Sequence, residues 1–408
     1  MNDSERVCVV GLGYIGLPTA SLLATKGFRV LGVDINPEVV DTINAGDIHI
    51  REPELDVLVR SAVQSGQLRA AMEPAVADVF IIAVPTPFKD GYVPDLQYVE
   101  DATRSVAPHL KHGNLLILES TIPVGTTARI ADLIAKARPD LGQNGIHIAH
   151  CPERVLPGRI LQELVVNDRI VGGVDDASTD AAAKFYRSFV SGNVLTTTAR
   201  TAELVKLVEN TYRDVNIAFA NELSLICDEL DMDVWELIDL ANHHPRVNIL
   251  RPGPGVGGHC LAVDPWFIVH SVPDLARLIK TGRQVNNSKP QYVVNKVVVH
   301  ARKIKKPVIA CFGLSYKPDI DDLRESPALR VVEALARTQL GQILVVEPNI
   351  RKLPVSLHAP HISLVEQEHA LAEADIVVGL VDHSSFRKIT PSELVNKALV
   401  DACGMWRH

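Results

Sequence analysis

The sequence predicts an α/β protein in which two doubly wound parallel sheets are joined by a central helical domain. Short β-rich runs alternate with helical patterns in the first half of the chain and again in its last third, which is typical of parallel α/β sheets. Between these parts, residues 201–230 have helical periodicity and contain no proline or glycine. A helix of that length extends about 45 Å, long enough to connect two domains.

The chain of 408 residues is longer than one ordinary hydrophobic core requires, so several domains are expected. We predict a Rossmann-like domain over residues 1–195, a central helical domain over residues 196–300 and a second, smaller doubly wound domain over residues 301–408. Strands of such sheets are near-continuous apolar runs, because both sheet faces are covered. These runs fall at residues 7–11, 29–33, 78–84, 114–119 and 146–149, and again at residues 307–313, 342–347, 375–381 and 398–401.

The central domain begins with the long helix at residues 201–230. Shorter helical stretches are expected after it, followed by a proline- and glycine-rich segment at residues 251–258. In the last third, Ser326 and Pro327 form a typical pair of N-cap and first helical residue. A helix is therefore expected to follow the first strand of the second sheet.

Composition disfavours several classes of function. The net charge of −8 argues against a nucleic-acid surface and requires arginine and lysine to be concentrated locally if the substrate is anionic. No apolar run approaches the roughly 20 residues of a membrane helix, and the polar N-terminus predicts no signal peptide. The six cysteines are scattered without a Cys-x-x-Cys pair, which predicts neither disulfides nor a metal site but a reducing cytoplasm. We therefore expect no nucleic acid, membrane or metal as a partner.

A glycine-rich turn directly after the first strand predicts a dinucleotide site. Gly11, Gly13 and Gly16 match the pattern G-x-G-x-x-G, with Tyr14 and Ile15 completing the turn into a helix. The glycines permit a tight turn and a close approach of the backbone to a pyrophosphate, which the helix N-terminus attracts. Taken alone, such a triplet also occurs in ordinary packing turns.

The residues that follow the next strands support the prediction of a dinucleotide site. Asp34 ends the second strand, where its carboxylate can accept hydrogen bonds from the adenosine ribose and would repel a 2′-phosphate. No arginine follows it directly, so we expect NAD rather than NADP. Thr86 and Thr121 follow the third and fourth strands, at the sheet edge where such folds bind ligands, although each is alone more typical of a cap or turn.

One cysteine stands apart from the other five. Cys260 ends the segment 253–260, which contains four glycines, and Asp264 follows it by four residues. Most cysteines are small core residues, but a glycine-rich loop exposes backbone N–H groups beside the thiol. Reactive thiols need such donors or nearby cations to lower their pKa. We therefore predict that Cys260 is a nucleophile.

Polar residues recur on one face of the long helix. Lys206, Asn210 and Arg213 follow each other at helical spacing on an otherwise apolar helix. A solvated polar stripe is the alternative interpretation. Further positive charge gathers in distinctive loops that suit phosphate groups, namely at Arg154, Arg246, Arg251, Lys317 and Arg324.

The order of these motifs resembles the UDP-glucose/GDP-mannose dehydrogenase family over essentially the whole chain. The matching segments are Gly-Leu-Gly-Tyr-Ile-Gly-Leu-Pro (11–18), Pro-Thr-Pro (85–87), Glu-Ser-Thr (119–121), Cys-Pro-Glu-Arg (151–154), Gly-Val-Gly-Gly-His-Cys (255–260) and Phe-Gly-Leu-Ser-Tyr-Lys-Pro (312–318). Segments 151–158, 212–222, 244–250 and 264–268 resemble in particular the bacterial members that oxidise UDP-N-acetyl-D-mannosamine. His259 replaces the serine of some UDP-glucose-oxidising members, which favours a different sugar.

The resemblance implies an N-terminal NAD domain, a central helical domain that forms a homodimer, and a C-terminal domain that binds the UDP-sugar. It implies that Cys260 is the nucleophile, that Lys206 transfers a proton or stabilises an oxyanion, that Asn210 and Asp264 assist, and that Glu153 helps to activate water. Substrate contacts carried over by motif are Arg154, Val155, Lys206, Asn210, Arg213, His244, Arg246, Gly257, Tyr316 and Lys317. Arg246 is a candidate contribution from the neighbouring subunit, and Arg324 would approach the NAD phosphates.

The reaction implied by the resemblance is a four-electron oxidation of the C6 alcohol of UDP-N-acetyl-D-mannosamine to the carboxylate, through a thiohemiacetal and a thioester on Cys260. The same reaction on UDP-N-acetylglucosamine or UDP-glucose is an alternative, since a few pocket contacts decide between such sugars. A two-electron hydroxyacid dehydrogenase, which would use a lysine and no thiol, is another. A non-catalytic sensor of NAD or UDP-sugar is an alternative of a different class, against which the presence of both Cys260 and Lys206 argues.

Overall fold

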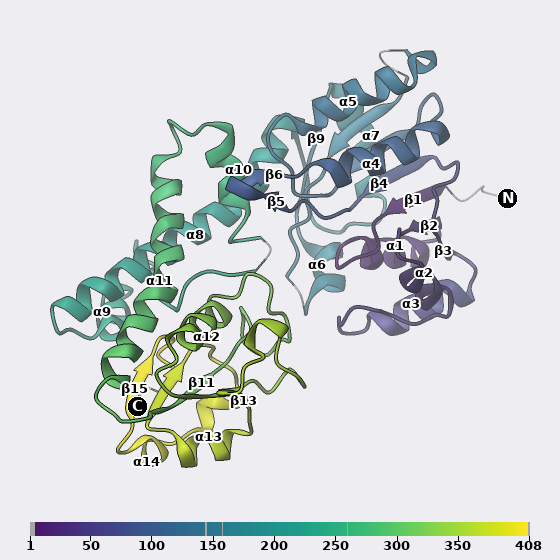
Figure 1. The fold of residues 1–408 in the computed structure, drawn as a ribbon. Helices are drawn as coiled ribbons and strands as arrows, with labels where there is room; N and C mark the ends of the chain where they lie inside the picture. The colour runs from purple at the N-terminus through teal and green to yellow at the C-terminus, as the bar shows by residue number, and fades with distance from the viewer. Residues whose placement is uncertain (1–4, 143–144, 157, 259, 407–408) are drawn as a thin grey trace. The chain divides into compact units, whose positions relative to one another are not determined.

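A computed structural model describes residues 5–142, 145–156, 158–258 and 260–406. The chain divides into two compact units, an N-terminal unit of residues 1–209 and a C-terminal unit of residues 210–408 (Figure 1). Each unit contains a largely or wholly parallel sheet, and a long helix follows the first sheet, which confirms the predicted fold class. The domain boundaries near residues 195 and 300 stay predictions.

The N-terminal unit is built on an eight-stranded sheet with the order β10-β9-β8-β7-β4-β1-β2-β3. Its strands are β1 (Arg6–Val10), β2 (Arg29–Val33), β3 (Leu68–Ala71), β4 (Val79–Ile82), β7 (Leu115–Leu118), β8 (His147–His150), β9 (Arg169–Gly173) and β10 (Val194–Thr198). Neighbouring strands are parallel except for β8 and β9. The strand order turns back between β1 and β4, and open α/β sheets bind ligands at such a switch point.

Helices cover both faces of this sheet. They are α1 (Gly16–Thr25), α2 (Pro37–Asn44), α3 (Leu55–Gln64), α4 (Gln97–Val106), α5 (Thr126–Ala137), α6 (Ile160–Val166) and α7 (Asp176–Arg187). Val7 and Val9 of β1 pack in one core with α1, α3 and α7, whereas Cys8 and Val10 pack in the other with α4 and α5. Both faces are therefore apolar, as the continuous hydrophobic runs predicted. A small hairpin of β5 (Phe88–Lys89) and β6 (Val93–Pro94) follows β4.

Helix α8 (Ala199–Glu229) has 31 residues and confirms the predicted long helix. It is followed by α9 (Val234–Ala241), α10 (Asp264–Ser271) and α11 (Arg277–Ala301). The 25 residues of α11 make a second long helix that was not predicted, and Pro290 lies inside it. Within the described parts of the chain, no helix is both long and apolar enough to span a bilayer.

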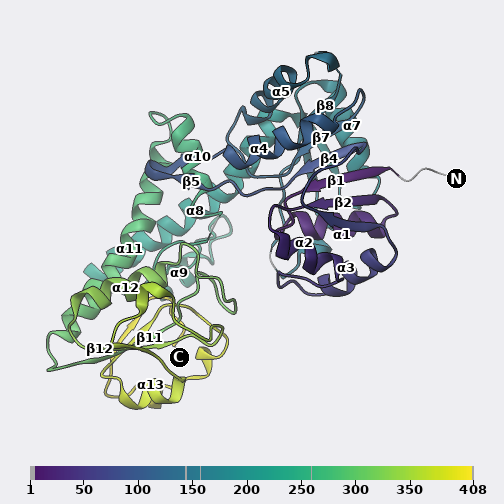
Figure 2. The ribbon, with the colours of Figure 1, turned by 45° about the vertical axis from the view of Figure 1, so that its right-hand side comes forward.

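The C-terminal unit contains a five-stranded parallel sheet with the order β13-β12-β11-β14-β15. The strands are β11 (Val308–Phe312), β12 (Gln342–Val346), β13 (Ile362–Leu364), β14 (Ile376–Gly379) and β15 (Ala398–Asp401). Helices α11 and α12 (Pro327–Thr338) cover one face, and α13 (Gln367–Glu373) covers the other (Figure 2). The short α14 (Pro391–Leu394) precedes β15. Ser326 caps α12 by accepting from the Leu329 N–H, as predicted.

Candidate active site

The glycine-rich turn after β1 is a steric requirement of the fold. Gly11 has a φ of +92°, which favours glycine, and its N–H donates to the Val33 carbonyl at 2.8 Å. A Cβ on Gly16 would lie 1.7 Å from the Gly11 carbonyl oxygen, so only glycine lets α1 start this close to the strand. No atom lies within 4 Å of the place where a Cβ on Gly13 would be. The turn thus offers the open backbone surface that a pyrophosphate needs.

The acidic residue at the end of β2 is held by this same turn. Asp34 accepts from the Leu12 N–H at 3.0 Å through Oδ2 and from the Asn36 N–H at 3.0 Å through Oδ1. The carboxylate is half-buried, so ligand hydroxyls can still reach it. Ile15 is the N-cap residue of α1, which carries no side-chain cap, and Tyr14 is exposed. These residues fit a dinucleotide with its phosphates at the N-terminus of α1.

The two predicted threonines lie together. Thr86 donates from Oγ1 to the Thr121 carbonyl at 2.6 Å, across the carboxyl ends of the paired strands β4 and β7. Ser120 donates from Oγ to the Val84 carbonyl at 2.7 Å and joins the same two loops. The loops that line the switch point are therefore fixed to each other.

A buried glutamate that the sequence analysis missed fixes the start of α8 to the adjacent loop. Glu203 accepts from the N–H groups of Gly125 and Thr127 at 2.5 and 2.7 Å, and from the Thr127 hydroxyl at 2.6 Å. It thereby caps α5, whose N-cap residue Gly125 has no side chain to do so. Glu203 lies three residues before Lys206, about one turn of α8 away. Its hydrogen bonds to the start of α5 therefore also fix the turn of α8 that carries Lys206.

The carboxylate of Glu153 is fully engaged. Oε2 accepts from Arg169 at 2.6 Å in a buried ion pair, and Oε1 accepts from the Arg154 N–H at 2.6 Å. The Arg154 side chain forms an ion pair with Glu209 at 2.6 Å and donates to the Asp168 carbonyl at 3.0 Å. Both predicted residues are therefore held in place by partners of the N-terminal unit.

Val155 is partly buried and packs against the hydrophobic core of the N-terminal unit. The two residues before it, Glu153 and Arg154, are held by polar partners. The segment after Cys151 is therefore fixed by polar contacts and by apolar packing together. Of the three residues predicted to contact substrate or water in this segment, Val155 alone offers an apolar surface.

Burial shifts the pKa values of groups beside Glu153. Burial, and then the charge of Glu153, raises the pKa of Glu119 to about 7, and Glu119 accepts from the Tyr186 hydroxyl at 2.7 Å. Burial, aided by the positive charge of Lys206, lowers the pKa of His150 to about 3. Glu119 follows β7 and His150 ends β8, so both groups lie at the carboxyl edge of the sheet. Sequence spacing gives no sign of this cluster.

Four of the six cysteines are buried, whereas Cys260 and Cys403 are half-buried. Cys8, Cys151 and Cys311 are buried, and desolvation raises the pKa of each thiol to about 12. Such thiols are inert core residues at neutral pH. Cys260 is half-buried instead, at the end of the glycine-rich segment. His259, the residue before it, lies outside the described residues.

A short turn joins the predicted nucleophile to its predicted neighbours in the C-terminal unit. The Cys260 carbonyl accepts from the N–H groups of Val263 and Asp264 at 3.0 and 2.8 Å, so Cys260 begins the turn from which α10 starts. Asp264 is buried, and its Oδ2 accepts from Asn210 Nδ2 at 2.5 Å. Asn210 of the long helix is thus hydrogen-bonded to the turn that contains both Cys260 and Asp264. Lys206 lies one helical turn before Asn210 on α8, and Arg213 is exposed on the same helix.

The glycine segment before Cys260 packs against the loop after β11. A Cβ on Gly257 would lie 2.5 Å from the Glu325 carbonyl oxygen and 2.9 Å from Tyr316 Cβ. Gly258 has a φ of +83°, and a Cβ there would lie 2.9 Å from the Tyr316 ring. The structure therefore brings together Gly257 and Tyr316, two predicted substrate contacts, and explains why glycine is needed.

The remaining predicted contacts lie in loops of the C-terminal unit. Lys317 is half-buried, and its carbonyl accepts from the Ser315 hydroxyl at 2.7 Å. Arg324 pairs with Asp322 at 2.6 Å. His244 and Arg246 are exposed after α9, where the Arg246 N–H donates to His244 Nδ1 at 3.3 Å.

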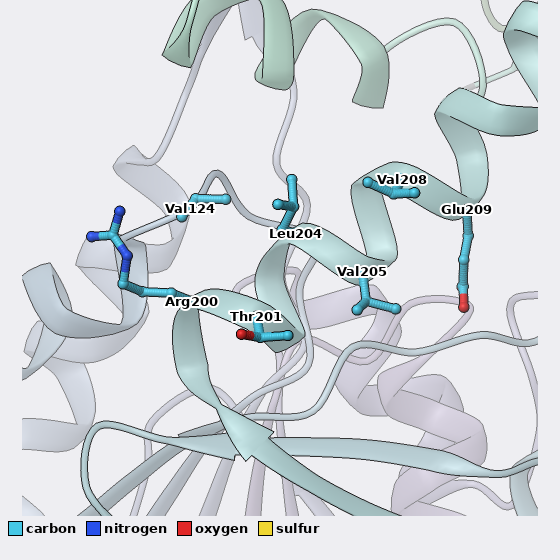
Figure 3. Close-up of a pocket in the computed structure, with 7 residues that line it drawn as sticks. All are labelled: Val124, Arg200, Thr201, Leu204, Val205, Val208 and Glu209. Atoms are coloured by element: carbon cyan, nitrogen blue, oxygen red, sulfur yellow. The ribbon is translucent and has the colours of Figure 1, made fainter.

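The N-terminal unit also contains a cavity of about 410 Å³ along the first turns of α8 (Figure 3). Its lining is mainly apolar and consists of Val124, Arg200, Thr201, Leu204, Val205, Val208 and Glu209. None of these residues belongs to the predicted site.

Within the described ranges, no group of three or more histidine, cysteine or acidic side chains is arranged to hold a metal ion.

Models of the UDP-glucose/GDP-mannose dehydrogenase family match three successive segments: its NAD binding domain at residues 5–190, its central domain at 200–288 and its UDP binding domain at 310–408. The chain is 57% identical to an NDP-N-acetyl-D-galactosaminuronic acid dehydrogenase of Ralstonia nicotianae, covering 99% of this chain and 97% of the relative. It is 55% identical to the UDP-N-acetyl-D-mannosamine dehydrogenase of Campylobacter jejuni, covering 97% and 100%. The solved UDP-D-ManNAc dehydrogenase of Pyrococcus horikoshii matches with a TM-score of 0.90 at 39% identity, covering 99% and 96%. These matches confirm the resemblance drawn from the motifs and NAD as the cofactor.

Proposed function

We propose that this chain, which belongs to the UDP-glucose/GDP-mannose dehydrogenase family, oxidises the C6 alcohol of a UDP-sugar to the carboxylate through a thioester on Cys260. The observation that carries the proposal is the turn from Cys260 to Asp264, where a half-buried thiol lies in the same turn as a carboxylate held by Asn210. A two-electron dehydrogenase would not require a nucleophile. Covalent capture would hold the reactive aldehyde between two oxidations.

When bound, NAD⁺ supplies the oxidising power by accepting one hydride in each of the two oxidations. The turn at Gly11–Gly16 and the Asp34 carboxylate fit it, because they offer open backbone at the phosphates and an acceptor at the ribose. Thr86 and Thr121 fix the loops at the carboxyl edge of the sheet. The first oxidation releases the proton of the C6 hydroxyl, and we assign its acceptance to Lys206, directly or through water.

Cys260 acts after the aldehyde has formed. Its sulfur adds to C6, and the thiol proton ends on the former carbonyl oxygen, which gives a thiohemiacetal. The second oxidation removes a hydride from C6 and a proton from that hydroxyl, which leaves a thioester. Water then adds to the thioester, the C–S bond breaks, and the thiol is restored with the free acid. For each sugar, two hydrides leave C6 and one water is consumed.

The neighbouring residues would stabilise the charges that develop on the C6 oxygen. Lys206 and Asn210 lie one turn apart on α8 and are proposed to donate to the oxyanion of the thiohemiacetal. Asp264 holds Asn210 by a hydrogen bond of 2.5 Å and is our first candidate to activate the hydrolytic water. Glu153 is the second candidate, although Arg169 and the Arg154 N–H already occupy its oxygens.

The UDP-sugar is proposed to lie on the C-terminal unit, with the nucleotide on the loop of Tyr316 and Lys317 and the sugar approaching Gly257. Arg246, Arg154 and Arg213 are proposed to neutralise the diphosphate, Arg246 from a neighbouring subunit, while His244 and Val155 complete the substrate contacts. We assign Arg324 to the phosphates of NAD. The roles of these residues follow the family's motifs.

We propose UDP-N-acetyl-D-mannosamine as the sugar nucleotide. Support comes from full-length relatives of that name at 52–55% identity, among them those of Campylobacter jejuni and Escherichia coli. The 57% identity to an enzyme named for N-acetyl-D-galactosaminuronic acid favours UDP-N-acetyl-D-galactosamine, which differs from the mannosamine sugar at C2 and C4, as a second candidate. UDP-N-acetylglucosamine and UDP-glucose complete the panel of substrates to be compared.

One assay tests the proposal. The purified protein is incubated with excess NAD⁺ and each of the four UDP-sugars, and NADH and uronate are counted for each sugar consumed. Two NADH and one uronate are expected with one preferred N-acetylated sugar. One NADH with an aldehyde or keto product would refute the four-electron reaction, and ligand binding without turnover would favour the sensor.

We propose that the enzyme is a homodimer formed through α8. Tyr212, Phe219 and Ile226 are exposed at intervals of seven residues on this helix, so they form an apolar line on one face. Substituting Phe219→Glu should convert the dimer to a monomer in light scattering, whereas a monomeric parent would contradict the assignment. We also propose a cytoplasmic location, because the reaction needs a reduced thiol.

A further inference from the structure

The loop after β11 in the C-terminal unit has the same turn as the dinucleotide loop after β1. Gly313 has a φ of +98° and donates from its N–H to the Val346 carbonyl at 2.9 Å. Gly11 has a φ of +92° and donates to the Val33 carbonyl at 2.8 Å. In both sheets the turn therefore connects the end of one strand to the end of the strand beside it.

The next residue of each turn is also held in the same way, by an acid at the end of the second strand. Leu12 donates from its N–H to Asp34 at 3.0 Å, and Leu314 donates from its N–H to Glu347 at 2.8 Å. Asp34 stays half-exposed, which suits contact with a ribose. Glu347 is only 4% exposed, so the same position has become internal in the second sheet.

The oxygens of Glu347 have no capacity left for a ligand. Oε2 accepts from the N–H groups of Leu314 and Ser315 at 2.8 and 3.1 Å and from His383 Nε2 at 3.1 Å. Oε1 accepts from the N–H and the side-chain amide of Asn349 at 3.1 and 3.2 Å. Burial opposes ionisation, but hydrogen bonds from His383 and the Leu314 N–H outweigh it and lower the pKa of this carboxyl.

His383 links this carboxylate to the far end of the loop. Its Nδ1 lies 2.9 Å from the Asp319 N–H, which can only donate, so the ring proton must lie on Nε2 and point to Glu347. The imidazole is 0% exposed and packs edge-on against Phe386 at 5.1 Å. One histidine thus binds both ends of the loop, at Asp319 directly and at Leu314 through Glu347.

The loop so held carries Tyr316 and Lys317 and contacts the segment of the nucleophile. The Tyr316 ring lies against Gly258, two residues before Cys260, and leaves no space for a Cβ there. Gly258 donates from its N–H to the Arg324 carbonyl at 3.2 Å on the same side of the loop. Displacement of the loop would therefore be passed to the thiol through backbone contacts.

We propose that Glu347 and His383 are positioning residues that hold residues 314–319 in the shape that binds the uridine diphosphate group and, through Tyr316, hold the glycine segment before Cys260. This inference rests on the proposed function. Glu347 would thus act by fixing the loop, whereas Asp34 at the matching position of the first sheet is available to a ligand. The pair would affect UDP affinity and the thiol, but not NAD affinity.

The test compares two substitutions that divide the contacts of His383. His383→Asn keeps an acceptor for the Asp319 N–H but loses the donor to Glu347, and His383→Gln does the reverse. His361→Gln is the matched control, because the side chain of this histidine hydrogen-bonds the Ala336 carbonyl and lies away from the loop, before β13. Asn349→Ala is a milder variant at an exposed position, which guards against loss of folding.

Five quantities are measured for each variant: UDP affinity by calorimetry, the rate at which iodoacetamide alkylates Cys260, NAD affinity, and kcat and KM for the UDP-sugar. His383→Asn is expected to weaken UDP binding about tenfold, because a buried carboxylate loses a donor. Asn349→Ala should weaken it by a smaller factor, roughly threefold. The alkylation rate should differ from the parent rate more in His383→Asn than in Asn349→Ala. In both variants KM for the UDP-sugar should rise by a larger factor than kcat falls. NAD affinity should stay at the parent value, as should all quantities measured for the His361→Gln control.

Equal UDP affinities in the parent, Asn349→Ala and whichever His383 variants fold would overturn the positioning role. Equal losses of UDP and NAD affinity would also overturn it, since they would indicate general destabilisation. A parent protein that binds no UDP would contradict the proposed function itself and this inference with it. A parent that binds UDP and oxidises its sugar, with variants that do the same equally well, contradicts the inference alone.

Discussion

At the scale of single residues, Cys260 and Cys403 are the two described cysteines that are not fully buried. Cys403 donates from its thiol to the Leu380 carbonyl at 2.9 Å, and burial raises its pKa well above the ordinary value. Cys260 instead begins the turn that ends at Asp264. The two thiols therefore make a matched pair for testing covalent catalysis.

Cys260→Ala is expected to abolish uronate formation, with a loss of at least about a thousandfold in turnover, because no thioester can form. NAD and UDP affinities should stay within about twofold of the parent, since the side chain is small. Cys403→Ser should keep full turnover. The measurement is uronate by chromatography, together with NADH by absorbance. Normal uronate production by Cys260→Ala would eliminate the covalent route.

Residue-level prediction from the sequence is possible where a residue's chemistry is local. Gly11 and Gly16 are recognisable because their turn needs glycine, and Asp34 because it ends the next strand. Glu203 was missed, because a carboxylate within a helix gives no sign that it caps another helix. His383 was missed for the same reason, since its partners lie 36 and 64 residues away in the sequence.

At the scale of elements, a buried polar network joins α8 to α11 in the C-terminal unit. Arg283 of α11 forms an ion pair with Asp214 of α8 at 2.5 Å, and the two residues are 2% and 0% exposed. Asn286 donates to Asp214 at 2.8 Å and accepts from Asn221. Asn221 in turn accepts from the Gly253 N–H at 2.8 Å, so the network also holds the start of the glycine segment.

Arg283→Met is expected to destabilise the protein by about 3–5 kcal/mol, because it leaves the Asp214 carboxylate buried without its cation. Burial raises the pKa of Asp214 in the parent, which indicates how costly its charge is. The double variant with Asp214→Leu should recover most of this loss, since it removes both charges. Chemical unfolding measures the difference. A double variant as unstable as Arg283→Met alone would show that packing, not charge, is responsible.

Elements were predictable where burial leaves a pattern. The apolar runs of β1, β4, β7, β11 and β14 are buried at every or nearly every position and were found from the sequence. Strand β10, Val-Leu-Thr-Thr-Thr, was missed because it lies at the sheet edge and is mostly exposed. Helix α11 was missed as a long helix, since Pro290 in a helix interior usually signals an end.

At the scale of the whole molecule, two buried groups set opposite pH dependences of stability. The pKa of Glu119 is raised from 4.5 to about 7, so its contribution is full below pH 4.5 and is lost as the pH rises towards 7. The pKa of His150 is lowered from 6.5 to about 3, so its contribution is full above pH 6.5 and is lost as the pH falls towards 3. Between pH 4.5 and 6.5 the two slopes cancel.

Single substitutions should reveal each slope separately. Relative to the parent, Glu119→Gln keeps an acceptor for Tyr186 and should gain stability as the pH rises from 4.5 to 7, by roughly 3 kcal/mol at the upper end. His150→Phe removes the group that must stay neutral, so relative to the parent it should gain stability as the pH falls from 6.5 towards 3, and lose that gain as the pH rises to 6.5. Melting temperatures measured from pH 4 to 8 by calorimetry give both differences. Slopes of the same sign in the two variants would contradict this assignment, because a carboxyl held protonated and an imidazole held neutral must respond to pH in opposite directions.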